Sequence, residues 1–122
     1  MAKRGRPKKA DADAAQKIQR NIEEIYKKYR NSTYVKYTKG VSEKTISKVP
    51  DDMLKTGADW FHKYAVELEC FLYETDEIFN YSEEEQDAYG DLMVEFKEWE
   101  YLYKEEARKR RLVRKGYKLD EM

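Results

Sequence analysis

The chain of 122 residues carries 25 Lys and Arg against 25 Asp and Glu, so its formal net charge at pH 7 is zero. Charged residues make up 41% of the sequence and only two prolines and five glycines interrupt it, which disfavours an all-β fold. No segment approaches the roughly 18 apolar residues of a membrane span, and the basic N-terminus lacks the apolar segment of a secretory signal. The single Cys70 has no partner in the chain, which predicts a reducing, cytoplasmic compartment.

The zero net charge conceals three segments of alternating sign. Residues 1–50 hold 14 basic and 5 acidic side chains, a net charge of +9, whereas residues 51–103 hold 3 and 16, a net charge of −13. Residues 104–122 hold 8 and 4, a net charge of +4. This segregation predicts that the ends of the chain face a polyanion and that the acidic middle faces a different partner.

The N-terminal half is predicted to begin with a disordered basic tail over residues 1–10, which lack apolar periodicity. Asp11 or Asp13 is expected to cap a first helix that ends at residues 31–32. One face of that helix is apolar and comprises Ile18, Ile22, Ile25 and Tyr29.

Residues 33–50 are harder to assign from the sequence. The stretch TYVKYT at residues 33–38 suits a strand or one short helix. Gly40 indicates a turn, and Ser42 is expected to cap a brief helix over residues 43–49, which Pro50 ends.

Residues 51–115 are predicted to form an acidic hairpin of two long helices. Pro50 is expected at the first position of one helix, and Ser82 with Glu85 forms a capping box for the other, which is expected to continue to Gly116. Their apolar faces step by three and four residues: Leu54, Ala58, Phe61, Ala65, Leu68 and Leu72, then Tyr89, Leu92, Phe96, Trp99 and Tyr103. The expected fold is therefore all-α, a small bundle dominated by an antiparallel hairpin, which the first helix completes or which oligomerises. Residues 116–122 are predicted to be a C-terminal tail.

The sequence KRGRPKK at residues 3–9 resembles an AT-hook, the short DNA-binding motif of architectural chromatin proteins. The resemblance implies contact with the minor groove of A·T-rich double-stranded DNA, and the chemistry agrees. A narrow A·T groove attracts inserted arginine, glycine lets the backbone approach, proline restricts the unbound chain, and lysines reach the phosphates. The implied DNA-binding residues are Lys3, Arg4, Gly5, Arg6, Pro7, Lys8 and Lys9. This function implies a nucleoid-associated protein, or a nuclear one in a eukaryote.

The sequence KGVSEKTISKV at residues 39–49 resembles the turn and recognition helix of helix-turn-helix repressors. The resemblance implies that Lys44, Thr45, Ser47 and Lys48 face the major groove of DNA. Three residues depart from the pattern: Lys36 stands where a small residue is usual, Lys39 where an apolar one is usual, and Pro50 shortens the second helix. A capped turn within a connector therefore remains open as an alternative.

The sequence shows no pattern for catalysis, metal binding or a cofactor. His62 is the only histidine and is expected on the surface or half-buried, and the chain contains neither GxxxxGK[ST] nor GxGxxG. The leading hypothesis is a non-enzymatic DNA-binding accessory protein whose residues 51–103 bind copies of itself or a protein partner. Its layout is similar to that of phage small terminase subunits, which act in DNA packaging, and to small transcription regulators. The alternative is a protein-interaction or structural module, such as a virion component or an inhibitor of a host enzyme.

Overall fold

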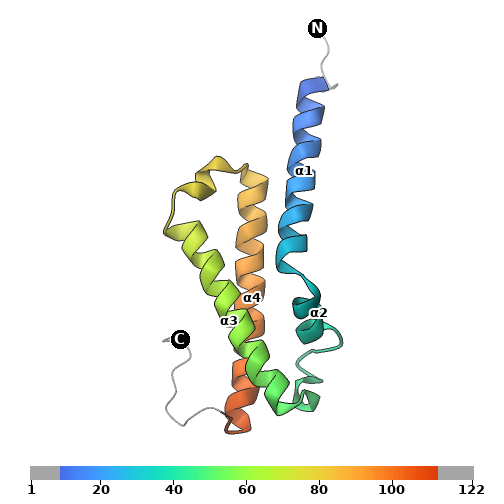
Figure 1. Ribbon diagram of the computed structural model, residues 1–122, viewed down its shortest axis with the longest axis vertical. Coiled ribbons are helices and arrows are strands. Elements are labelled where there is room, and N and C mark those ends of the chain that lie inside the picture. Colours follow the sequence, from blue (N-terminus) through green and yellow to red (C-terminus); the bar gives the residue numbers. More distant parts are fainter. Residues whose placement is uncertain (1–8, 113–122) are drawn as a thin grey trace.

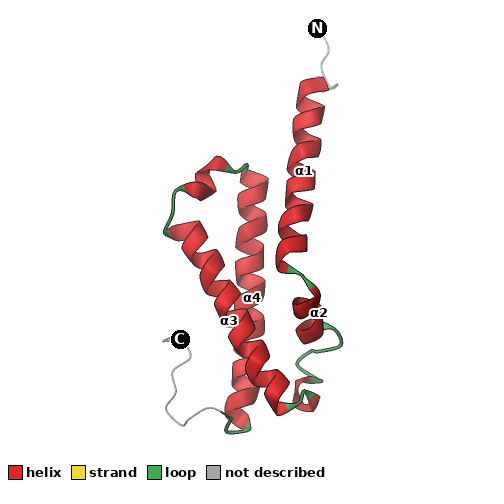
Figure 2. Ribbon diagram, viewed as in Figure 1, coloured by secondary structure: helices red, strands yellow, loops and turns green. Residues whose placement is uncertain are grey.

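The computed structural model describes residues 9–112, with side chains from residue 12 onward. Its elements are α1 (Lys9–Tyr29), α2 (Ser32–Thr38), the 3-10 helix η1 (Ile46–Lys48), α3 (Asp51–Tyr73), the 3-10 helix η2 (Glu77–Asn80) and α4 (Glu83–Lys109). These residues contain no strand, and the predicted all-α class is confirmed (Figure 2). No helix among them is both long and apolar enough to cross a membrane.

The helices form a small bundle organised around the α3–α4 hairpin. Helices α3 and α4 run antiparallel, and α1 lies along α4 (Figure 1). The first turns of α1 extend past the end of the hairpin at which η2 lies (Figure 1). On the predicted apolar face of α1, Ile25 and Tyr29 are buried, whereas Ile18 and Ile22 are half-buried. The first helix therefore completes the bundle as a third long member.

Aromatic side chains fill most of the core between the long helices. Phe61 of α3 stacks on Trp99 of α4 at a ring-centroid distance of 5.8 Å, and it meets Tyr103 edge to face at 5.5 Å. Such pairs contribute about 1 kcal/mol each beyond the apolar area that they bury. The predicted apolar faces are buried except at Leu72 and Trp99, which are half-buried.

The junction of α1 and α2 is attached to α4 through one carboxylate. Arg30 forms an ion pair with Glu95, and the Tyr34 hydroxyl donates a hydrogen bond to the same side chain. Burial, and then the bond to Glu95, raise the pKa of Tyr34 to about 12. Tyr34 therefore stays protonated at neutral pH and remains a donor to Glu95.

Helix ends agree with the predicted signals at some positions and not at others. The capping box of Ser82 and Glu85 is present, and Asn31 ends α1 and caps α2 through two backbone N–H groups. Helix α1 begins at Lys9, however, so Asp11 and Asp13, the predicted caps, both lie inside the helix. Pro50 was predicted to be the first helical residue of α3, but it is the N-cap, one position earlier.

Helix α4 ends at Lys109, earlier than the predicted residue 115. Arg111 adopts a left-handed conformation with φ of 59°. Its N–H donates to the carbonyl of Arg108, and the N–H of Leu112 donates to the carbonyl of Ala107, which together form a Schellman motif. Gly116, the predicted helix stop, lies outside the described residues.

The connector between α2 and α3 differs from the predicted one. The stretch TYVKYT belongs to helix α2, and Gly40 forms the predicted turn with φ of 74°. The prediction of an α-helix over residues 43–49 is wrong, because only the three residues of η1 are helical. The guanidinium of Arg110 offers the physical reason, since it donates to the carbonyls of Ile46 and Val49 and holds this backbone against α4.

Gly57 allows α3 and α4 to approach closely. A Cβ atom at this position would lie 2.5 Å from the ring of Tyr103 and 3.2 Å from the ring of Tyr37. Tyr103 is fully buried, and its hydroxyl donates to the backbone carbonyl of Tyr37. The packing of α3 against α4 thus requires a residue without a side chain at position 57. From the sequence alone, Gly57 is only a residue of low helix propensity within α3.

Gly57→Ala is therefore expected to destabilise the fold. The strain of one extra methyl in a packed core costs about 1–3 kcal/mol, which exceeds the gain of about 1 kcal/mol in helix propensity. Gly90→Ala is the matched control, because a Cβ there meets nothing within 4 Å, and it should stabilise the protein. Urea unfolding of the two variants measures both effects, and equal stabilisation by both would contradict the close approach.

Arg111→Gly is expected to stabilise the fold. A left-handed conformation costs a non-glycine residue about 1 kcal/mol, and the Schellman motif accommodates glycine at this position without that cost. The free energy of unfolding should rise by up to about 1 kcal/mol in urea titrations. Arg111→Ala serves as the control, since it removes the charge but keeps the Cβ, and it should not produce this gain.

Candidate functional site

Most of the hook-like segment lies outside the described residues, namely Lys3, Arg4, Gly5, Arg6, Pro7 and Lys8. Its last residue, Lys9, is the first residue of α1. The motif therefore leads directly into a helix whose first turns extend past the hairpin (Figure 1).

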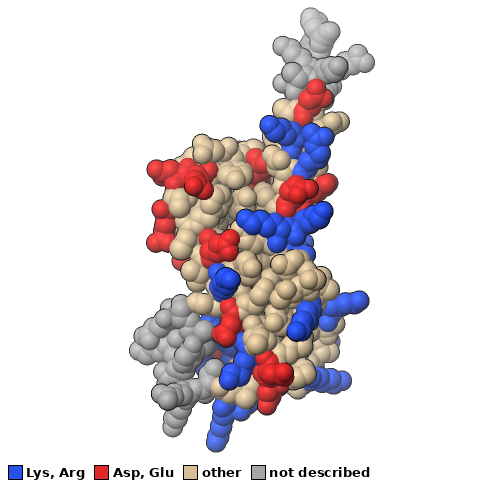
Figure 3. All heavy atoms as spheres, in the orientation of Figure 1, with Lys and Arg blue, Asp and Glu red and all other residues tan. Residues whose placement is uncertain are grey.

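Basic side chains continue from α1 over α2 and the following loop. Nine of them are exposed in the described residues: Lys17, Arg20, Lys27, Lys28, Arg30, Lys36, Lys39, Lys44 and Lys48. Among these nine, only Arg30 takes part in a salt bridge with another described residue. Figure 3 shows blue side chains along α1 and red ones around the hairpin end near η2. On this face the hairpin end near η2 is acidic, whereas acidic and basic side chains alternate along α1.

The residues of the helix-turn-helix resemblance do not lie on a second α-helix. Lys44, Ser47 and Lys48 are exposed on the loop and on η1. Thr45 is half-buried, and its hydroxyl donates to the Gly40 carbonyl at 2.9 Å and accepts from the Ser42 N–H at 2.8 Å. Thr45 thus stabilises the loop, while the three exposed residues are free to contact phosphates.

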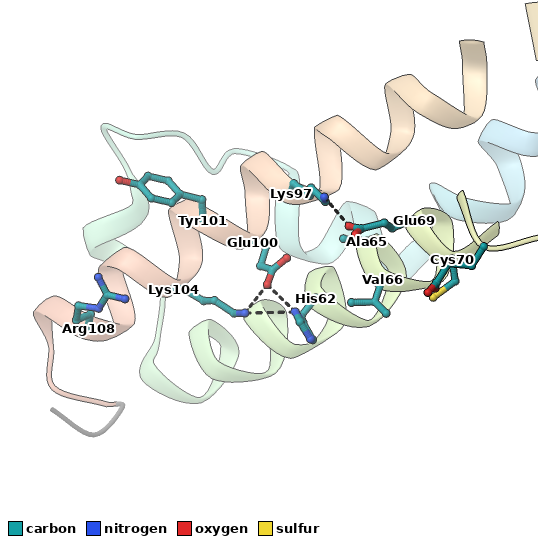
Figure 4. A pocket seen from close by; sticks show the side chains of 11 residues that line it. His62, Ala65, Val66, Glu69, Cys70, Lys97, Glu100, Tyr101, Lys104 and Arg108 are labelled. Atoms are coloured by element: carbon teal, nitrogen blue, oxygen red, sulfur yellow. Dashed lines mark hydrogen bonds and ion pairs between the residues drawn. The ribbon is translucent and has the colours of Figure 1, made fainter. Parts of the chain in front are cut away.

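A groove of about 700 Å³ between α3 and α4 has no counterpart in the sequence predictions (Figure 4). Its lining residues come from these two helices and from Glu74, the C-cap of α3: His62, Ala65, Val66, Glu69, Cys70, Glu74, Lys97, Glu100, Tyr101, Lys104 and Arg108. Lys97, Lys104 and Arg108 of the lining belong to α4, whereas the acidic Glu69 and Glu74 belong to α3 and its C-cap. In the sequence, only the i,i+4 spacing of Glu100 and Lys104 indicates an interaction between lining residues of this groove.

Three polar side chains meet at one side of the groove (Figure 4). Glu100 Oε2 lies 2.7 Å from His62 Nδ1 and accepts a hydrogen bond from the Lys104 ammonium. The Lys104 ammonium lies 3.4 Å from the same Nδ1, so each of the three groups contacts the other two. The Lys104 side chain is only 2% exposed, so Glu100 is the counterion that keeps its charge tolerable in the interior. His62 is half-buried, as predicted.

The groove shows no arrangement for nucleophilic or metal chemistry. A hydrogen bond to the Glu74 carboxylate, and then burial, raise the pKa of the Cys70 thiol, so at neutral pH it is held in the unreactive thiol form. No group of three or more His, Cys, Asp or Glu within the described part of the chain could hold a metal ion. The polar cluster is charge-balanced, since Lys104 offsets Glu100.

Comparisons with protein-family models, with curated proteins and with solved structures find no match to this chain. The arguments about function therefore rest on its own residues.

Glu100→Ala is expected to destabilise the protein by about 3 kcal/mol, because it leaves the buried Lys104 ammonium without a counterion. Glu69→Ala is the matched control. Glu69 pairs with Lys97 at 2.6 Å, but both side chains are 48% exposed, so its loss should cost less than about 1 kcal/mol. Urea unfolding at neutral pH measures the loss of stability in both variants. A similarly small loss in both would contradict the role of Glu100 as the counterion of Lys104.

Proposed function

We propose that this protein is a non-enzymatic DNA-binding accessory protein that contacts A·T-rich duplex DNA through its basic N-terminal end. The sequence KRGRPKK, which leads directly into α1, carries the proposal. Arg4 and Arg6 would enter the narrow minor groove, where the negative potential is strongest. Gly5 permits close approach of the backbone, and Pro7 limits the conformational entropy lost on binding.

The surface charge supports a second, sequence-independent contact with the phosphates. Eight of the nine exposed basic residues between Lys17 and Lys48 form no salt bridge within the described chain, so they are available to a polyanion. The hairpin that follows is acidic and would repel DNA. DNA is therefore expected on the α1 and α2 side, where Lys44, Ser47 and Lys48 also lie exposed on the connector.

DNA packaging or transcription regulation is the setting that we favour, on the similarity of layout to phage small terminase subunits and small regulators. A protein-interaction module, such as a virion component or an enzyme inhibitor, is the second candidate. The observation that favours it is the set of exposed apolar side chains on the hairpin, among them Tyr101 at 65%. Deletion of residues 1–10 separates these functions, because an interaction module would keep its activity without them.

The double variant Arg4→Ala with Arg6→Ala is expected to abolish the preference for A·T over G·C duplexes. Residual binding should be equal for the two duplexes, because the phosphate contacts carry no sequence information. Fluorescence anisotropy with both duplexes over a salt series measures the preference and the number of phosphate contacts.

The control for this experiment is Lys8→Ala with Lys9→Ala, which removes the same number of charges. It should weaken binding to both duplexes alike and reduce the salt slope while keeping the preference. Wild-type protein that shows no salt-sensitive DNA binding would overturn the proposed function.

A further inference from the structure

The outward side of α4 carries a regular pattern of residues that the fold of one chain does not use. Every third or fourth residue from Glu84 to Arg108 lies on this side, and all of them are exposed except Glu105, which is half-exposed. At about 1.5 Å per residue, the helix of 27 residues is about 40 Å long. Residues at a 3–4 spacing lie on one side of a helix, so a second helix packed there would contact all of them.

Two large apolar side chains, Val94 and Tyr101, flank Glu98 in the middle of this outward stripe. Tyr101 is 65% exposed and Val94 is 50% exposed, two values that are high for large apolar groups on the interior turns of a helix. Tyr101 lines the groove between α3 and α4, and with Val94 it also lines a second hollow of about 610 Å³. The centre of the stripe thus lies between two depressions that could receive side chains.

The charges at the two ends of the stripe have opposite signs. Glu84, Asp87 and Asp91 lie towards the N-terminal end of α4, whereas Arg108 lies in its last turn and Arg111 follows two residues after its last residue. Two copies of α4 packed in parallel would place like charges together, which is destabilising. An antiparallel pair would place the acidic end of each copy against the basic end of the other.

We propose that α4 is a homodimer interface at which two copies pack antiparallel about a two-fold axis. One register satisfies the apolar and the charged residues together. It places Val94 of each copy opposite Tyr101 of the other, and Lys97 opposite Glu98, near the axis. The same register places Asp87 opposite Arg108 and Glu84 opposite Arg111 at both ends, so each contact occurs twice, as a two-fold interface requires.

Two contacts in this register are of like charge. Glu98 of each copy comes near Glu98 of the other at the axis, where the neighbouring Lys97 side chains lie beside both carboxylates. Asp91 comes near Glu105 of the other copy, but Glu105 already binds Arg108 of its own chain at 2.8 Å. That guanidinium lies beside both carboxylates in the dimer and offsets their repulsion.

The dimer adds what a single DNA-binding motif lacks. Helices α1 and α4 begin at the same end of the bundle (Figure 1), so antiparallel pairing places the two N-terminal segments at opposite ends of the dimer. Two weak contacts on one particle bind DNA with avidity or join two duplexes. This consequence rests on the proposed function, but the dimer itself does not.

Light scattering and sedimentation of the full chain, without DNA, test the dimer. The expected mass is twice that of the chain, and Val94→Glu with Tyr101→Glu should reduce it to one chain. Tyr73→Glu, which changes a residue 71% exposed on α3, is the control and should leave the dimer intact. Circular dichroism verifies that each variant is helical. A wild-type monomer over the whole concentration range, or an assembly larger than two, would overturn the proposal.

Charge reversal tests the antiparallel register. Asp87→Arg alone and Arg108→Asp alone should each weaken the dimer several-fold, because each places like charges opposite one another twice. The double variant should recover the dimer, whereas Asp59→Arg, an exposed reversal on α3, should not change it. If the double variant dissociates more than either single variant, the register is refuted. The DNA assays above are scored separately, so failure of the dimer and failure of DNA binding are distinguishable.

Discussion

The close contact between Gly57 and Tyr103 is the constraint on which the rest of the bundle depends. Tyr103 occupies the space that a side chain at residue 57 would need, and its hydroxyl donates to the Tyr37 carbonyl. Burial raises the pKa of Tyr103 to about 12, so the donor stays protonated at any physiological pH. One side chain of α4 thereby fixes the crossing of α3 and also holds the end of α2. This contact therefore joins α2, in the basic half of the chain, to the acidic hairpin of α3 and α4.

Arg110 makes the second attachment between the two halves. It donates to backbone carbonyls of the connector and pairs with Asp51 and Glu106, each at 2.9 Å. The bond to Glu106, supported by Asp51, raises the pKa of Arg110, which is charged in any case. Because these carbonyls are engaged by α4, residues 43–49 remain a loop with one 3-10 turn, and their exposed side chains face away from the attachment.

Local signals made the helices predictable, whereas contacts between distant residues did not. The 3–4 spacing of apolar residues and the capping box of Ser82 and Glu85 were sufficient for the hairpin and its core, because both depend on neighbouring positions. Three features involve residues at least 38 positions apart in the sequence. These are the packing role of Gly57 against Tyr103, the reduction of the predicted helix at residues 43–49 to the three residues of η1 beside Arg110, and the counterion role of Glu100 beside His62 and Lys104. The first two depend on contacts with another helix, which a short stretch of sequence does not reveal.

The division of charge also separates two surfaces that would otherwise compete. The basic residues lie on α1, α2 and the connector, whereas the groove between α3 and α4 takes no side chain from α1 or α2. The connector reaches the stripe only at the second hollow, where Glu43 lines the wall beside Val94 and Tyr101. Acidic residues at the N-terminal end of α4 would repel DNA from that stripe and, in an antiparallel pair, attract the basic end of a second copy. One charge pattern can thus direct two different partners to two different faces.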